Sequence, residues 1–245
     1  MKKVLNIILT MALCAALAAC GSNQAADISD NNPDAMYDAY NSALENLIQN
    51  HILPDGTDGG DQYGDMAENK FAVCDVDNDG KEELILLYTT TSEGGWAGFV
   101  LGYDEKTKKL QTELCDYTLL TFYDNGIIKA GWHNNQRLGG DFWPYSLYQY
   151  APDSDSYALV GMVDAWDKNY PGPDNPRDEF PSDIDKSGTG FVYYIMKEGK
   201  YDNTHPVDAS EYNEWLNAYI GNVSEIQIPY RNLTEENISQ INMMQ

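Results

Sequence analysis

The sequence has little positive charge. Its 245 residues include 15 lysines and arginines against 39 aspartates and glutamates, so the formal net charge is −24. Because phosphate contacts need clustered basic side chains, this balance argues against nucleic-acid binding. It also argues against electrostatic attraction to anionic lipid. The composition suits a protein outside the cytoplasm that takes up cations.

Familiar catalytic patterns are also missing. The three histidines, His51, His133 and His205, have no neighbour at metal-ligand spacing. No nucleophile elbow, zinc-protease motif, P-loop or dinucleotide fingerprint occurs. A glycosidase needs two carboxylates across a cleft, and nothing in the sequence singles out such a pair. We therefore lean toward a protein that is not an enzyme, and we name no catalytic residue.

Cysteines are few. Two of the four, Cys14 and Cys20, belong to the N-terminal segment, which leaves Cys74 and Cys115. An oxidising compartment permits a disulfide between them. Two buried free thiols fit the same spacing, because cysteine packs as a small hydrophobic residue. The sequence leaves both alternatives open.

A long hydrophobic run occurs only at the N-terminus. Lys2 and Lys3 precede an apolar stretch, 4–19, that is too short to span a membrane and is flanked like a secretory signal. The stretch ends in "LAAC", which resembles the bacterial lipobox, whose cysteine becomes the lipidated first residue of the mature protein. The resemblance implies a signal peptide over 1–20, lipidation of Cys20, and a lipid-anchored, extracytoplasmic location in the cell envelope.

The remaining chain is expected to be one domain behind a tether. Residues 21–33 are small and polar and predict a flexible tether. Apolar residues at helical spacing follow Pro33. From about 67 to 202, short runs rich in Val, Ile, Tyr and Thr alternate with turn signals, as in antiparallel sheets. Helical spacing returns after Asp208 and again after Thr234.

Four hairpins are predicted in the strand-rich part. Their turns are "EKTKK", Asn125-Gly126, "APDSDS" and Glu198-Gly199, the last joining "FVYYIM" to "KYDN". The expected class is α+β, mainly β, with an antiparallel meander sheet. An N-terminal helix and C-terminal helices flank this sheet within a single domain, 34–245.

The most informative stretch is "DVDNDGKEEL", residues 75–84. Asp75, Asp77 and Asp79 alternate, a glycine follows, and Glu83 precedes an apolar strand. Alternate residues of a tight loop point inward, the glycine permits the bend, and Ca²⁺ prefers such hard oxygen ligands. Without a cation the carboxylates would repel one another. A solvated acidic turn is the alternative, but the pattern favours a structural calcium site.

The pattern Asp-x-Asp-x-Asp-Gly-x-x-Glu-Leu before a strand resembles the integrin-type FG-GAP and VCBS calcium hairpins, whose loop joins two strands of a propeller blade. The resemblance implies side-chain ligands from Asp75, Asp77, Asp79 and Glu83, and a carbonyl ligand from Lys81. More broadly, the chain is similar to acidic bacterial lipoproteins of unknown function that carry one such loop. That similarity implies no established activity.

Two further stretches are candidates for binding. "DIDKSGTG" from 183 repeats the spacing with Asp183, Asp185 and Ser187. It is either a degenerate second calcium loop or a plain loop.

The segment "GWHNNQRLGGDFWPY" offers Trp132, His133, Asp141 and Trp143. Aromatic faces beside polar groups suit sugar binding, whereas large aromatic residues more often fill a core. We expect the core role for the tryptophans.

Three function classes remain. The first is a calcium-stabilised, non-catalytic surface module for binding or adhesion, with a glycan as one ligand class. The second is a subunit that binds another envelope protein. The third is an extracytoplasmic hydrolase acting on glycan. The tether, the acidic loop and the missing catalytic motifs favour the first.

Overall fold

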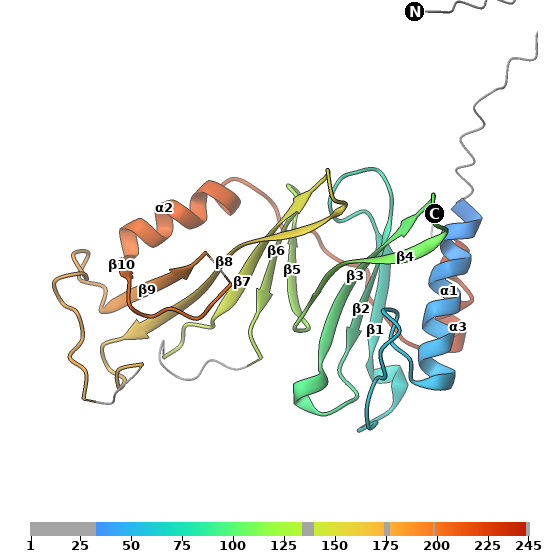
Figure 1. Cartoon of the computed structure of the whole chain (residues 1–245), viewed down its shortest axis with the longest axis horizontal. Coiled ribbons are helices and arrows are strands. Elements are labelled where there is room, and N and C mark those ends of the chain that lie inside the picture. The colour runs from blue at the N-terminus through green and yellow to red at the C-terminus, as the bar shows by residue number, and fades with distance from the viewer. Residues whose placement is uncertain (1–32, 134–139, 174–176, 198, 244–245) are drawn as a thin grey trace, which may run out of the picture. The chain divides into compact units, whose positions relative to one another are not determined.

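The computed structural model describes residues 33–133, 140–173, 177–197 and 199–243. Strands dominate these residues and form two antiparallel sheets, with helices toward both ends of the chain (Figure 1). The expected class, α+β and mainly β, is confirmed. Residues 1–32, which include the predicted signal peptide, Cys20 and most of the tether, lie outside the described residues. No described helix combines the length and the apolar character needed to cross a membrane.

The first sheet has five strands in the order β11-β1-β2-β3-β4. Their bounds are β1 (Lys70–Cys74), β2 (Glu83–Tyr88), β3 (Ala97–Asp104), β4 (Lys109–Asp116) and β11 (Arg231–Asn232). Two 3-10 helices, η1 (Met66–Glu68) and η2 (Glu93–Gly95), precede β1 and β3. Strands β1 to β4 form a meander, and β11 brings the end of the chain back to its edge.

Helix α1 (Pro33–Asn50) packs against one face of this sheet (Figure 1). Its fully buried residues Tyr40, Leu44 and Leu47 recur at helical spacing and supply the apolar stripe that docks. The hydroxyl of Tyr40 donates a hydrogen bond of 2.7 Å to the carbonyl of Glu82. Helix α1 is therefore fixed to the end of the acidic loop. Two short C-terminal elements, α3 (Glu235–Ile238) and η3 (Ile241–Met243), join the same core.

The second sheet has six strands in the order β10-β9-β8-β7-β6-β5. Their bounds are β5 (Leu119–Tyr123), β6 (Ile127–Gly131), β7 (Tyr145–Ala151), β8 (Ser156–Asp167), β9 (Phe191–Met196) and β10 (Pro206–Asp208). Helix α2 (Ala209–Ile220) begins after β10, with Asp208 as its N-cap accepting the amide of Ser210. Hairpins β3–β4, β5–β6 and β7–β8 use the three predicted turns.

The fourth predicted hairpin is wrong in its second strand. The partner of β9 is Pro206–Asp208 rather than "KYDN". The reason is local, because Asp202 accepts hydrogen bonds from the amide and hydroxyl of Thr204. These side-chain hydrogen bonds hold the backbone in a local turn, which prevents it from pairing with β9 there. Strand β10 therefore begins only at Pro206.

A shared apolar cluster joins the two sheets. Ala72, Ile85 and Val100 on the first sheet pack with Phe122 and Ile128 on the second. Alternation along each strand explains this, since the neighbouring residues of β1, β2 and β3 face α1 instead.

Cys74 and Cys115 are both free thiols, the first half-buried and the second exposed. The structure therefore shows no disulfide. The alternative of two buried free thiols holds only in part, because Cys74 is half-buried and Cys115 is exposed.

Candidate metal centre

The acidic stretch forms the loop between β1 and β2, and its side chains bind its own backbone. Asp75 accepts the amides of Asn78 and Gly80 at 2.7 and 3.1 Å. Asp77 accepts the amide of Asp79 at 2.9 Å. Asn78 and Gly80 have φ angles of 64° and 89°. Glycine suits such a left-handed position at little cost, so the sequence folds this loop into a tight curl.

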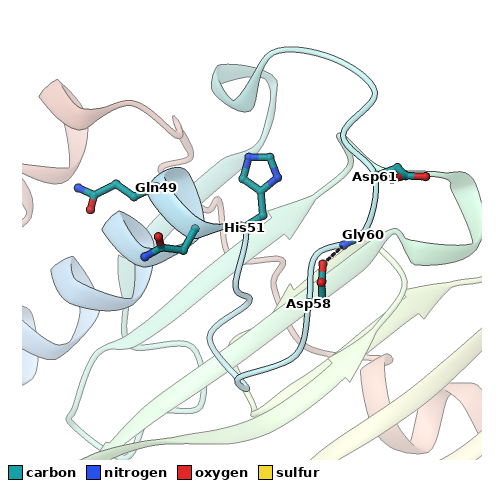
Figure 2. Close-up of a pocket in the computed structure, with 6 residues that line it drawn as sticks. Gln49, His51, Asp58, Gly60 and Asp61 are labelled. Atoms are coloured by element: carbon teal, nitrogen blue, oxygen red, sulfur yellow. Dashed lines mark hydrogen bonds between the residues drawn. The ribbon is translucent and has the colours of Figure 1, made fainter.

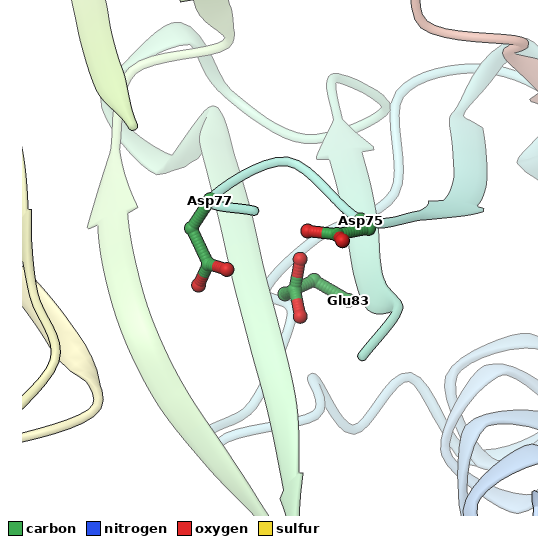
Figure 3. A group of neighbouring side chains, drawn as sticks. All are labelled: Asp75, Asp77 and Glu83. Carbon is green, nitrogen blue, oxygen red and sulfur yellow. The ribbon is translucent and has the colours of Figure 1, made fainter. Parts of the chain in front are cut away.

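Three of the predicted ligands converge under the loop. Oxygens of Asp75, Asp77 and Glu83 lie within 4.8 Å of one another (Figure 3). Calcium binds oxygens at about 2.3–2.6 Å, so two ligands of one ion lie no farther apart than about twice that. Asp77 and Glu83 are buried, with exposed fractions of 7% and 2%. Glu83 also accepts the amide of Val76 at 2.9 Å, which fixes its carboxylate beneath the loop.

The other two predicted ligands are placed differently. Asp79 forms an ion pair with the ammonium of Lys81 at 3.1 Å and accepts the amide of Lys81. It does not belong to the converging group of Asp75, Asp77 and Glu83. Ligation by Asp79 and by the carbonyl of Lys81 stays a prediction.

Two acidic residues that the sequence did not single out also reach the loop. Oxygens of Glu113 and Asp155 lie within 4.8 Å of each other and of Asp77. Glu113 belongs to β4, and Asp155 to the β7–β8 turn of the second sheet.

A β-bulge aims Glu113 inward. The register pairs Val100 with Leu114 and Leu101 with Thr112, which leaves Glu113 as the extra residue. Bulges redirect side chains in this way. On β3, Gly102 makes room, because a Cβ there would collide with the Glu113 carboxylate. In the sequence, the one sign that Glu113 points inward is that a strand glutamate stands across the hairpin from a glycine, Gly102.

Burial raises the pKa values of these carboxyl groups. Desolvation is the main cause in each case, and neighbouring carboxylates add to it. The pKa of Glu83 rises to about 9, that of Glu113 to about 8, and that of Asp77 to about 6. Without a positive charge beside them, Glu83 and Glu113 keep a proton near neutral pH. A divalent cation would replace these protons.

The stretch at 183 does not form a second cluster of this kind. Asp185 accepts the amides of Thr189 and Gly190 at 2.9 Å. The amide and hydroxyl of Ser187 donate to Asp208, the N-cap of α2. These contacts favour a plain loop that supports α2, and among the described residues no acidic group of metal-binding geometry includes Asp183 or Asp185.

The aromatic segment lies near the surface. Trp132 and His133 line a cavity of about 380 Å³ together with Asp116, Tyr117 and Tyr148.

Beside this cavity, Trp143 is 45% exposed, and its indole donates to the carbonyl of Trp132 at 2.6 Å. Asp141 is exposed and is not among the residues that line the cavity. The expectation that the tryptophans fill the core is wrong for Trp143, whereas Trp132 is half-buried and packs against the buried cluster that contains Trp166. Residues 134–139 of this segment lie outside the described residues.

Another hollow, of about 680 Å³, lies beside the end of α1. Its lining is polar and includes His51, Asp58 and Asp61. Figure 2 shows these side chains pointing in different directions, and Asp58 accepts the amide of Gly60 at 2.8 Å. The polar side chains that line this hollow therefore do not converge on a common point.

Comparisons with protein-family models, curated proteins and solved structures find no match to this chain.

The raised pKa values predict an unusual pH dependence. Between the ordinary pKa of a glutamate, 4.5, and about 9, folded Glu83 keeps a proton that the unfolded chain has lost. Stability of the metal-free protein therefore falls as pH rises through this window, and is fully present below it. We expect the melting temperature in EDTA to fall between about pH 5 and about pH 8, and Ca²⁺ to raise it most at the higher pH.

Glu83→Gln should make this dependence less steep in EDTA, with Glu113 and Asp77 accounting for what remains, whereas Glu45→Gln on the exposed face of α1 should leave it unchanged. A melting temperature in EDTA that stays level or rises over the same pH range would contradict the assignment.

Proposed function

We propose that the protein is a lipid-anchored, extracytoplasmic binding module whose fold is stabilised by calcium at the β1–β2 loop, and that it is not an enzyme. One observation carries the proposal: Asp75, Asp77 and Glu83 place oxygens within 4.8 Å of one another in a largely buried position. Carboxylates brought together away from water must either bind protons or share a cation. Carboxylate oxygens are hard ligands, which Ca²⁺ prefers.

The position of the site supports a structural role. Asp75 directly follows β1 and Glu83 begins β2, so one ion would fix both strands of a hairpin at the centre of the first sheet. The neighbouring Glu82 carbonyl accepts from Tyr40 of α1. A cation here would therefore stabilise the loop and the helix packed against it. The burial of Asp77 and Glu83 leaves little room for a substrate at the ion.

Calcium binding can be measured on the soluble fragment 21–245. Isothermal titration with Ca²⁺ should give heat of binding, and EDTA should lower the melting temperature. Asp75→Asn should weaken binding by about tenfold or more, because it removes a charged ligand. Asp183→Asn, in the plain loop, is the matched control and should bind as the parent does. The absence of both the heat and the EDTA effect would refute the calcium proposal.

The anchor is supported by the N-terminal sequence alone. A basic start, a short apolar stretch and Cys20 after small residues fit a lipoprotein signal. Two or more acyl chains would attach the protein stably to a membrane.

Metabolic labelling with an alkyne fatty acid in an expressing bacterium tests this. The full chain should become labelled, Cys20→Ser should abolish the label, and Cys14→Ser should retain it. Label that persists on Cys20→Ser would show that Cys20 is not the acceptor.

A glycan is the ligand class favoured by the aromatic cavity. Trp132, Tyr117 and Tyr148 offer apolar faces, and Asp116 offers a carboxylate that accepts the Tyr148 hydroxyl at 2.6 Å. Among the described lining residues Asp116 is the single carboxylate, whereas glycoside hydrolysis ordinarily uses two. The arrangement therefore favours binding over hydrolysis. Binding to another envelope protein remains the second alternative, without a specific surface to support it.

A glycan array with the soluble fragment tests this ligand class. Trp143→Ala and Tyr117→Ala should weaken binding to any array hit by about three- to tenfold, the size of one lost aromatic contact. Tyr63→Ala, which removes an exposed tyrosine before β1, should not. Hits that are insensitive to both cavity variants, or an array with no hits, would reject the glycan proposal.

A further inference from the structure

The junction of the two sheets contains buried oxygens that no described residue satisfies. Asp77 Oδ2 and Glu113 Oε2 lie within the protein without a hydrogen-bond partner among the described residues. Both residues are more than nine-tenths buried, with exposed fractions of 7% and 6%. Buried polar atoms are ordinarily paired, so each of these two requires an explanation.

A third unpaired group lies beside them. The hydroxyl of Tyr157 on β8 has no partner among the described residues, and Tyr157 is 8% exposed. The ring of Tyr157 lies 5.6 Å from that of Tyr150, whose hydroxyl donates to Asp155 of the same acidic group. Three neighbouring groups with spare oxygen atoms are what a cation and its bound water would use.

Asp155 completes the group from the second sheet. Its Oδ1 accepts the hydroxyl of Tyr150 at 2.6 Å, which fixes the carboxylate. Its backbone carbonyl accepts a hydrogen bond from the side-chain Nε2 of Gln111 on β4, also at 2.6 Å. The turn carrying Asp155 is therefore attached to the strand carrying Glu113. Asp77, Glu113 and Asp155 then offer oxygens within 4.8 Å of one another.

Lys81 does not account for this negative charge. Its ammonium contacts Asp79 at 3.1 Å and reaches Asp155 only at 4.0 Å. Its side chain is 51% exposed, and neither Asp77 Oδ2 nor Glu113 Oε2 is paired with it. The ammonium thus lies at the rim, and although its charge acts on Glu113, no described cationic side chain pairs with either buried oxygen.

From these contacts we propose that Asp77, Glu113 and Asp155 bind a divalent cation between the two sheets. The site takes a hard cation of the Ca²⁺ class, and it joins the β1–β2 loop and β4 of the first sheet to the β7–β8 turn of the second. It extends the proposed loop site, with which it shares Asp77. It needs neither Asp75 nor Glu83, so variants separate the two.

The test is calcium titration of the full chain in detergent, with the number of bound ions and the calcium-induced rise in melting temperature as readouts. Terbium provides a second probe, because Tyr150 and Tyr157 beside the site can sensitise its luminescence. Glu113→Gln and Asp155→Asn should each remove one equivalent of Ca²⁺ or weaken it by about tenfold or more, and reduce the terbium signal. Asp153→Asn, an exposed aspartate in the same turn, is the matched control and should leave both readouts unchanged.

The outcomes distinguish this site from the loop site. If Glu113→Gln and Asp155→Asn lower calcium binding while Asp75→Asn does not, the inter-sheet site stands and the loop proposal fails. If only Asp75→Asn lowers binding, the inter-sheet site is overturned and the loop site stands.

Loss of binding in all three variants supports ligation by Glu113 and Asp155, and no binding to the parent overturns both sites. Misfolding is monitored by melting in EDTA, where Glu113→Gln should match the parent because glutamine has the size and shape of a protonated glutamate. Asp155→Asn, at a half-buried turn position, provides the second variant.

Discussion

Carboxylates removed from water need a proton, a hydrogen-bond donor or a cation at each oxygen, and this requirement dominates the junction between the two sheets. Asp77, Glu83 and Glu113 are all buried there. Backbone amides satisfy one oxygen each of Asp77 and Glu83. The remaining charge can be removed only by protonation or by a cation. Protonation of these carboxylates stabilises the protein more at low pH, whereas cation binding stabilises it more at high pH. The pH dependence of stability therefore distinguishes a proton from a cation at this junction.

The backbone around these groups is shaped to keep them close together. The β1–β2 loop curls through Asn78 and Gly80, and the bulge in β4 adds Glu113. Gly102 leaves room for that carboxylate. Asn78 then donates from its side chain to the carbonyl of Asp124, in the β5–β6 turn of the second sheet. The bulge interrupts the regular pairing of β3 with β4.

The contiguous part of the site could be predicted from the sequence, because ligand spacing within one tight loop is set by local geometry. That logic predicted Asp75, Asp77 and Glu83, which the fold brings together. It could not predict Glu113 and Asp155. Glu113 depends on a bulge fixed by pairing with β3, and Asp155 stands in an ordinary turn whose position depends on how two sheets pack. The hairpins and the α+β class likewise follow from local patterns, whereas the start of β10 at Pro206 depends on a side-chain turn at Asp202 that the strand pattern does not reveal.

The acidic centre and the aromatic cavity are connected through the same two strands. On β4, Glu113 belongs to the centre and Asp116 lines the cavity three residues later. On β7, Tyr150 bonds Asp155 at the centre, while Tyr148 bonds Asp116 at the cavity. Packed strands move as units rather than bending freely. An ion that fixes β4 against the β7–β8 turn would therefore also fix the wall of the cavity, so that calcium would act on ligand binding through geometry rather than through contact with the ligand.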